Sequence, residues 1–249
     1  AYVQALTAAV RGGINFLDTS LNYRHQRSER AVGEALRALF DSGAAKRDEV
    51  VVCTKAGYLV PGAVPPDVAS TGEVVGKMHS MAPAFLADQL KRSLGNLGLS
   101  GVDVFYLHNP ETQLQSVTGE EFLARADRAF ECLEQLVRQG KIRFYGTATW
   151  QGFRQKEPGA GTLPLVKLVE RAVAGGGENH RFRFVQLPLN LGMVEAFGER
   201  PEEVEGGRIS VLQAAASLGL TVVASASLLQ GRLVRGVPRE VGERLPGPA

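Results

Sequence analysis

Four side chains in the sequence could together deliver a proton to a carbonyl oxygen. Asp18 and Tyr23 stand close together in DTSLNY, Lys55 directly follows the apolar run VVVCT, and His108 follows VDVFYL. A phenol titrates near pH 10, which is too high for an efficient proton donor at neutral pH. A nearby ammonium favours the phenolate, a carboxylate holds that ammonium charged and in place, and a neutral imidazole can orient a carbonyl group. Together the four residue types indicate general acid catalysis of carbonyl reduction.

Each of these residues also has an ordinary structural interpretation. A single Asp after a strand is often a helix cap or turn former, and a single Lys is usually solvated. Their shared place just past predicted strands favours the functional interpretation, and Gln186, which closes FRFV, shares that place. The hydride for a reduction must come from a cofactor, because no side chain can supply one.

The elements that must position these residues alternate along the chain. Short apolar runs typical of strands buried on both faces are predicted at 14–17, 50–54, 102–107, 142–146, 182–187 and 220–224. Stretches of helical period lie between them, near 28–39, 83–97, 120–139, 165–172 and 209–218, and a further one opens the chain. Ser28 is expected to be the N-cap of the first of these helices, Pro83 to begin the second, and Gly219 to end the last.

This repeated βα pattern predicts an α/β fold, either an open doubly wound sheet or a (β/α)8 TIM barrel. No G-x-G-x-x-G sequence is present, which disfavours the doubly wound dinucleotide fold. About six βα units can be counted where a closed barrel has eight. We therefore expect residues 1–249 to form a single, incomplete barrel domain, with the first and last strands outside the sequence. The long connections at about 56–82 and 188–208 are expected to be substrate loops.

The composition excludes several other classes of protein. With 44% hydrophobic and 22% charged residues, the sequence is typical of a soluble globular domain. Its net charge of +2 is too small for a nucleic-acid or membrane surface, and no apolar run approaches the roughly 20 residues of a membrane span. Two cysteines and no signal-peptide pattern indicate a cytoplasmic protein, and the four histidines lack metal-ligand spacing, so no metal is expected.

The sequence around the four candidate residues resembles that of the aldo-keto reductases of bacterial type. GINFLDTSLNY followed by SERAVGEAL resembles that family's signature G-x-x-x-x-D-T-(A/S)-x-x-Y with its trailing S-E-x-x-x-G. VVVCTK resembles its lysine strand, DVFYLHNPE its histidine strand, GKIRFYGTATW the next strand and FVQLPLN its glutamine strand. The resemblance covers nearly the entire chain and implies an NADP-dependent oxidoreductase that reduces an aldehyde or ketone to an alcohol with hydride from NADPH.

The resemblance implies a role for each residue. Tyr23 is the expected proton donor, Lys55 and Asp18 tune it, and His108 positions the substrate carbonyl. Gln186 is expected to hold the nicotinamide carboxamide. The expected partner is a small-molecule carbonyl substrate, and the sequence indicates no particular oligomeric state.

Further cofactor contacts are expected at positions where the sequence departs from the family. Ala148 and Thr149 stand where the family usually has Ser-Asn, and Thr149 can still bond to the carboxamide. Ser225 stands where the family often stacks a Tyr on the nicotinamide, and Leu228 is the best-kept position of the pyrophosphate loop. The segment that contacts the adenosine 2′-phosphate is expected beyond residue 249, so NADP rather than NAD follows from family habit.

Two aromatic residues are candidates for the wall of a substrate pocket. Tyr58 comes soon after the lysine strand and Trp150 follows another strand end, although packing in the core or a loop is an equal alternative for each. Other functions also remain open. The same fold could serve a nucleotide-sensing regulatory subunit or an inactive fragment, and Lys55 could form a Schiff base in a lyase.

Overall fold

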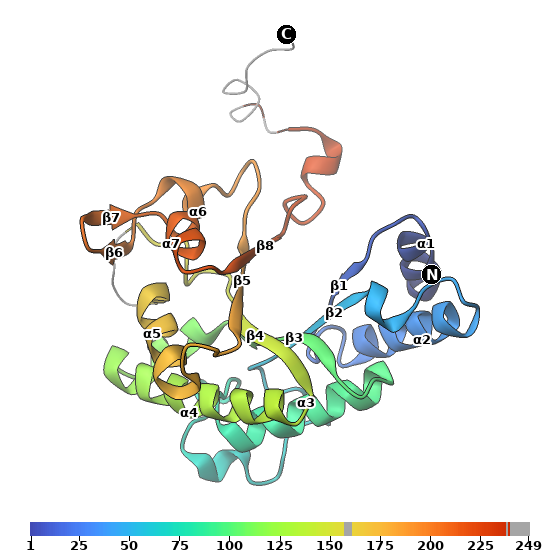
Figure 1. The fold of residues 1–249 in the computed structure, drawn as a ribbon, viewed down its shortest axis with the longest axis horizontal. Coiled ribbons are helices and arrows are strands. Elements are labelled where there is room, and N and C mark those ends of the chain that lie inside the picture. The colour runs from blue at the N-terminus through green and yellow to red at the C-terminus, as the bar shows by residue number, and fades with distance from the viewer. Residues whose placement is uncertain (157–160, 238, 240–249) are drawn as a thin grey trace.

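Six parallel strands form one curled sheet in the computed structural model, which describes residues 1–156, 161–237 and 239. The strands, in their order across the sheet, are β1 (Phe16–Asp18), β2 (Val51–Ala56), β3 (Val102–His108), β4 (Ile142–Ala148), β5 (Phe182–Pro188) and β8 (Thr221–Ser225). Every predicted strand is present, and all neighbours pair in parallel. Figure 1 shows the sheet curling like half of a barrel, so the prediction of an incomplete (β/α)8 barrel is confirmed. The single domain predicted for 1–249 includes residues 157–160, 238 and 240–249, which lie outside the described residues.

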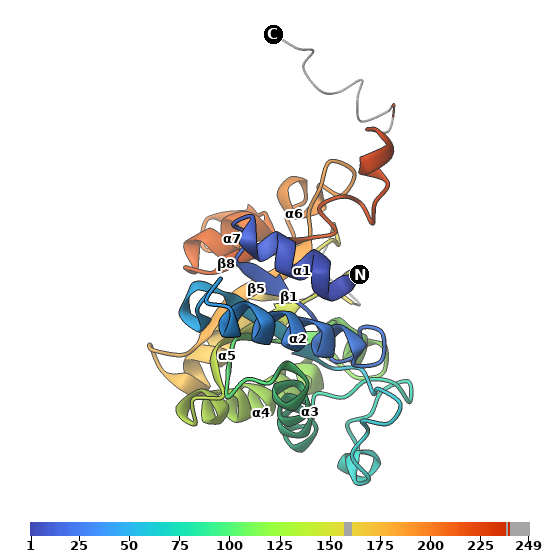
Figure 2. The same ribbon diagram turned by 90° about the vertical axis from the view of Figure 1, so that its right-hand side faces the viewer.

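Helices cover the outer, convex face of this sheet. They are α1 (Tyr2–Arg11), α2 (Arg27–Asp41), α3 (Pro83–Leu97), α4 (Gly119–Arg138), α5 (Leu165–Gly176) and α7 (Val211–Ser217). Figures 1 and 2 show α2 to α5 packed along the outside of the strands, with α1 beside α2. The main core lies between the two layers, since the apolar stripe of α3 is buried there with the outer side chains of β3. Pro83 is the first residue of α3, as predicted.

Two predicted helix starts are wrong, and local hydrogen bonds explain both. Ser28 is not the cap of α2, because the helix already begins at Arg27 after Gln26, which has a left-handed φ of 69°. The Ser28 hydroxyl instead accepts a hydrogen bond from Thr19. The last predicted helix begins at Val211 rather than at Ile209, because Ser210 accepts from the backbone of Gln213 and the Gln213 side chain accepts from Ser210 N.

The connections that follow β2 and β5 carry short elements of their own. The first holds the 3₁₀ helix η2 (Val68–Thr71), and a bridge joins Tyr58 to His79. The second holds α6 (Glu195–Gly198) and a hairpin of β6 (Glu202–Val204) and β7 (Gly207–Ile209). The buried Glu202 carboxylate accepts hydrogen bonds from the first two backbone N–H groups of α5, which ties the hairpin to that helix.

The parallel pairing brings the carboxyl ends of the strands to one edge of the half-barrel. Asp18 ends β1, His108 ends β3, and Lys55 and Gln186 lie within two residues of the ends of β2 and β5. Within the part of the chain that is described, no helix is long and apolar enough to cross a membrane. The same residues contain no cluster of three or more His, Cys, Asp or Glu side chains that could hold a metal ion.

Candidate active site

A buried ammonium group lies at the centre of the carboxyl edge. The side chain of Lys55 is 0% exposed, and its Nζ lies 2.6 Å from Asp18 Oδ2, 2.9 Å from the backbone oxygen of Thr19 and 3.5 Å from the Tyr23 hydroxyl. A buried charge is costly unless it is paired and hydrogen-bonded. An ammonium has three hydrogens to donate, and these three oxygens match them. The arrangement therefore fixes a positive charge beside the phenol of Tyr23.

The phenol of Tyr23 lies between this ammonium and an imidazole. Nζ of Lys55 is 4.8 Å from the centre of the Tyr23 ring, and the ring meets that of His108 edge-on, with centroids 5.7 Å apart. Tyr23 itself is 38% exposed. The chain beyond it turns sharply, because Arg24, His25 and Gln26 all have positive φ. Tyr23 thus combines a fixed electrostatic environment with access from outside.

The imidazole of His108 is buried and electrically neutral. Burial, together with the positive charge of Lys55 and the neighbouring His79, lowers the pKa of His108 to about 3. Its Nδ1 lies 3.2 Å from the hydroxyl of Ser20, a residue in DTS that the sequence reasoning did not single out. A neutral imidazole has one N–H donor and one acceptor nitrogen. The Ser20 hydroxyl also donates to Asn22 Oδ1 at 2.6 Å, so in this arrangement Nδ1 of His108 is the donor to Ser20. The other ring nitrogen, Nε2, remains for a bound molecule.

A cavity of about 450 Å³ opens over these side chains. Its lining residues are Phe16, Asp18, Tyr23, His108, Asn109, Ala148, Thr149, Trp150, Gln186, Val223, Ala224, Ser225, Ala226 and Gln230. Most of the residues proposed from the sequence are among them. The cavity has room for a ring-sized group beside the phenol, and its wall alternates apolar surface with amide and hydroxyl groups.

Three of the four predicted cofactor contacts line this cavity. Gln186 lies in its wall, and its amide donates to Asp18 Oδ1 across the half-barrel at 3.0 Å. Thr149 and Ser225 also line the cavity, although the Thr149 hydroxyl already donates to Glu111. Leu228 does not line the cavity, and 58% of its surface is exposed.

Of the two aromatic candidates, only Trp150 lines the cavity. Tyr58 lies behind His108, with the two rings edge-on and their centroids 5.2 Å apart. The Tyr58 hydroxyl accepts a hydrogen bond from the Asn109 side chain at 2.8 Å. Tyr58 and Trp150 both line a neighbouring cavity, so Tyr58 supports His108 rather than facing the phenol.

Glu111 is a buried residue of the site that the sequence reasoning missed. Its Oε1 accepts hydrogen bonds from the Thr149 hydroxyl at 2.6 Å and from the backbone N–H groups of Trp150, Gln151 and Gly152. The carboxylate therefore holds the turn that follows β4 against the helical turn that follows β3. An acidic residue three positions after His108, in HNPE, was the available signal.

Comparison with known proteins places this geometry in context. The model of the aldo/keto reductase family matches residues 2–157. The NADH-specific methylglyoxal reductase of Escherichia coli is 30% identical over 152 residues, which are 59% of this chain and 40% of that protein. The chain spans about two fifths of the length of its first-ranked curated relatives.

Two solved structures illustrate the proteins that share the fold of this chain. A glycerol dehydrogenase from Gluconobacter oxydans aligns with a TM-score of 0.60 at 20% identity, over 99% of this chain and 58% of its own. An aldo-keto reductase from Bombyx mori, solved in complex with NADP, aligns with a TM-score of 0.54 at 18% identity, over 90% of this chain and 55% of its own. At these identities the likeness shows a shared fold.

Proposed function

Because this chain belongs to the aldo/keto reductase family, we propose that it reduces an aldehyde or ketone to an alcohol with hydride from a nicotinamide cofactor. The observation that supports this function is that Asp18, Tyr23 and His108 line one cavity, with the buried Lys55 ammonium paired to Asp18 and in contact with the Tyr23 hydroxyl. The proposed substrate is a small molecule, since the cavity measures about 450 Å³.

In this proposal Tyr23 donates the proton. As its proton leaves, negative charge develops on the phenol oxygen, and the Lys55 ammonium 3.5 Å away stabilises that charge. Asp18 holds Lys55 in position through a 2.6 Å ion pair. Such a fixed charge needs no reorganisation during the reaction, which makes it more effective than a solvated one.

His108 and Ser20 orient the carbonyl group. When the Ser20 hydroxyl turns from Asn22 Oδ1, 2.6 Å away, to donate to Nδ1 of His108, the neutral imidazole carries its proton on Nε2 and can donate it to the carbonyl oxygen. The carbonyl oxygen would then lie between two donors, the imidazole and the phenol of Tyr23. This arrangement both places the oxygen and polarises the bond for attack at carbon.

The cavity wall fits a nicotinamide group. Gln186, Ser225 and Gln230 offer amide and hydroxyl groups that complement a carboxamide, and Phe16 and Val223 offer apolar surface for the ring. A nicotinamide held there would supply the hydride for the reduction. We propose NADPH as the cofactor, and since the Escherichia coli relative is NADH-specific by name, both dinucleotides belong in the test.

Two alternatives are disfavoured by the surroundings of Lys55 and Tyr23. A Schiff-base lyase needs a free amine that faces its substrate, whereas Lys55 is buried and its hydrogens face Asp18, Thr19 and Tyr23. A nucleotide sensor without catalysis has no need of a phenol held against a buried ammonium.

Replacement of Tyr23 by Phe in the full-length protein tests the proposal. The change removes the proton donor and keeps the ring, so turnover of 4-nitrobenzaldehyde should fall by about 10²- to 10⁴-fold. Fluorescence titration should show unchanged binding of NADPH or NADH. Tyr2→Phe, on exposed α1, is the matched control and should retain full turnover. Wild-type turnover by Tyr23→Phe would refute the role of the phenol, and dinucleotide binding without reduction of any carbonyl would favour the sensor.

A further inference from the structure

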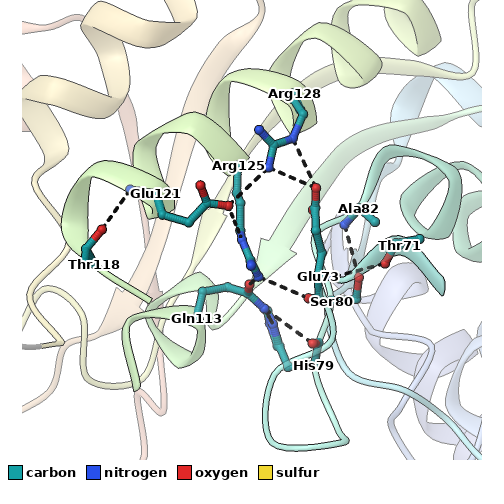
Figure 3. A network of polar contacts seen from close by, with 10 residues as sticks. All are labelled: Thr71, Glu73, His79, Ser80, Ala82, Gln113, Thr118, Glu121, Arg125 and Arg128. Atoms are coloured by element: carbon teal, nitrogen blue, oxygen red, sulfur yellow. Dashed lines mark hydrogen bonds and ion pairs between the residues drawn. The ribbon is translucent and has the colours of Figure 1, made fainter. Parts of the chain in front are cut away.

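A second buried histidine lies directly behind the candidate active site. His79, in the connection between β2 and α3, is 0% exposed and does not line the cavity. Its Nε2 lies 2.8 Å from the backbone oxygen of His108, and its Nδ1 lies 2.8 Å from the amide nitrogen of Gln113. Figure 3 shows the His79 ring reaching Gln113, which in turn faces Arg125. None of the proton-transfer steps above uses this residue.

Hydrogen bonds run in series from Arg125 through Gln113 and His79 to the backbone oxygen of His108. Arg125 determines which group donates in each of them. Its guanidinium can only donate, and Nη1 lies 2.6 Å from Oε1 of Gln113, so that oxygen must accept. The amide NH₂ group of Gln113 therefore faces His79 and donates to Nδ1, as well as to the backbone oxygen of His79 at 3.3 Å. With Nδ1 accepting, the ring proton of His79 is on Nε2. From there it is donated to the backbone oxygen of His108.

Arg125, the first residue in this series of hydrogen bonds, is itself held in place on α4. Arg125 forms an ion pair with Glu121 at 2.9 Å, and its Nη1 also donates to the backbone oxygen of Glu73 at 3.4 Å. Arg128, one turn further along α4, pairs with the Glu73 carboxylate at 3.0 Å. Figure 3 shows these contacts side by side. They anchor the connection that carries Glu73 and His79 to the outer helix layer.

Ring contacts form a second route from His79 to His108. The His79 ring meets Tyr58 edge-on at 5.4 Å, and Tyr58 meets the His108 ring edge-on at 5.2 Å. The backbone of Gly57 lies close against this cluster. A Cβ at Gly57 would lie 2.5 Å from the backbone oxygen of His108 and 2.7 Å from Nε2 of His79. The space around the hydrogen bond is therefore closed to any side chain at that position.

We propose that His79, in its Nε2–H tautomer, is a positioning residue for His108. It holds the carboxyl end of β3 through the backbone oxygen of His108 and holds the imidazole through Tyr58, so that the imidazole faces Tyr23. The functional consequence rests on the role proposed above for His108. Burial lowers the pKa of His79 to about 4, which agrees with the neutral ring that an accepting Nδ1 requires.

Two substitutions separate the hydrogen bond from the packing of the ring. His79→Gln places an amide N–H near the position of Nε2, whereas His79→Leu fills similar space without a donor. In the full-length protein with 4-nitrobenzaldehyde and NADPH, His79→Leu should lower kcat on the order of 10- to 100-fold through misplacement of His108. The Kd of NADPH should stay unchanged, and His79→Gln should stay within about threefold of wild type.

The tautomer of His79 and the position of the His108 ring can be measured by NMR, without an activity assay. In ¹⁵N-histidine-labelled protein, His79 should appear as the Nε2–H tautomer with a ring proton protected from exchange. His79→Leu should shift the ring signals of His108, and His79→Gln should restore them. His180→Gln is the matched control, because His180 is also buried but contacts Arg183 rather than the site. If His79→Leu does not fold, Gln113→Met replaces it, since it removes the donor to Nδ1 while His79 remains.

Two results would overturn the proposal. One is an Nδ1–H tautomer at His79 in the wild-type protein. The other is a folded His79→Leu protein with wild-type kcat and unmoved His108 signals. Failure of the proposed function looks different, because Tyr23→Phe would then retain turnover while the histidine signals still responded to His79→Leu.

Discussion

Replacement of Lys55 by methionine isolates the electrostatic part of the proposed mechanism. Methionine fills similar space but carries no charge. At an effective dielectric constant of about 20, an ammonium and a phenolate oxygen 3.5 Å apart attract each other by about 5 kcal/mol. Since only part of this charge has developed when the proton is in transit, the expected loss in the transition state is about 3 to 4 kcal/mol. That corresponds to a fall in kcat of about 10²- to 10³-fold.

The carboxylate of Asp18 makes the test more specific. Lys55 Nζ lies 2.6 Å from Asp18 Oδ2 and 3.5 Å from the phenol oxygen of Tyr23. The distance between those two oxygens is therefore at most the sum of these contacts, about 6 Å. At that separation it repels a phenolate by about 3 kcal/mol. In Lys55→Met this repulsion is no longer opposed. Adding Asp18→Asn should therefore recover about tenfold in kcat relative to Lys55→Met alone.

The measurement is kcat for 4-nitrobenzaldehyde at saturating NADPH. The reaction is monitored through the decrease in absorbance of the reduced nicotinamide. Circular dichroism and thermal melting should establish that each variant is folded at the assay temperature. Lys167→Met, an exposed lysine of α5, is the matched control and should retain wild-type kcat. A folded Lys55→Met protein with kcat within threefold of wild type would refute the assigned role of the ammonium. A double variant no faster than Lys55→Met would show that the phenol does not sense the charge of Asp18.

Three further features of the site give expectations of their own. Gly57→Ala should lower the free energy of unfolding in urea by about 2 to 4 kcal/mol, because its Cβ would lie 2.5 Å from the backbone oxygen of His108. Gly95→Ala, whose Cβ would meet nothing within 4 Å in α3, should raise that free energy by about 0.5 to 1 kcal/mol, and equal effects would contradict the argument. His79 stays neutral in the folded protein down to about pH 4, whereas the unfolded chain protonates it near its usual pKa of 6.5. The unfolded state therefore binds more protons, so stability falls as pH falls from 6.5 towards 4, and His79→Gln should reduce this slope by about 1.4 kcal/mol per pH unit. Glu111→Ala removes the acceptor of three backbone N–H groups and should cost about 3 kcal/mol. It should also change the emission of Trp150, the single tryptophan of the chain, and an unchanged spectrum would show that Glu111 does not hold the turn.

The strands were predictable because their environment leaves a strong pattern in the sequence. A parallel strand covered by helices outside and by the barrel interior inside is apolar on both faces, and VVVCT and VDVFYL have that character. The same reasoning located Asp18, Lys55 and His108, since a polar residue at the end of such a run stands out. Parallel pairing then requires these ends to share one edge, which the register of β1, β2 and β3 confirms.

Helix starts and loop contacts were less predictable because they depend on single hydrogen bonds or on distant partners. Ser28 is a good cap by residue type, but the left-handed residue Gln26 is the cap, so the helix starts two residues earlier than predicted. Tyr58 and Leu228 were assigned by their nearness in sequence to functional positions. In space, Tyr58 accepts a hydrogen bond from the Asn109 side chain and lines a neighbouring cavity, and Leu228 is 58% exposed. Neither contact has a periodicity that sequence analysis could detect.

The buried polar residues missed in the sequence share one physical task, which is to fix loops at the carboxyl edge. Glu111 binds the turn after β4, and His79 binds the end of β3 from the connection after β2. Each residue places a polar group where water is excluded. Such a group destabilises the fold unless its hydrogen-bond partners are in place. A loop held by buried hydrogen bonds would lose them if it shifted, which favours a single position. Polar contacts of this kind therefore gather at the edge where Tyr23 and His108 must keep their relative positions. The main core between sheet and helices is apolar, apart from contacts such as the buried hydrogen bond from Thr54 to Glu29.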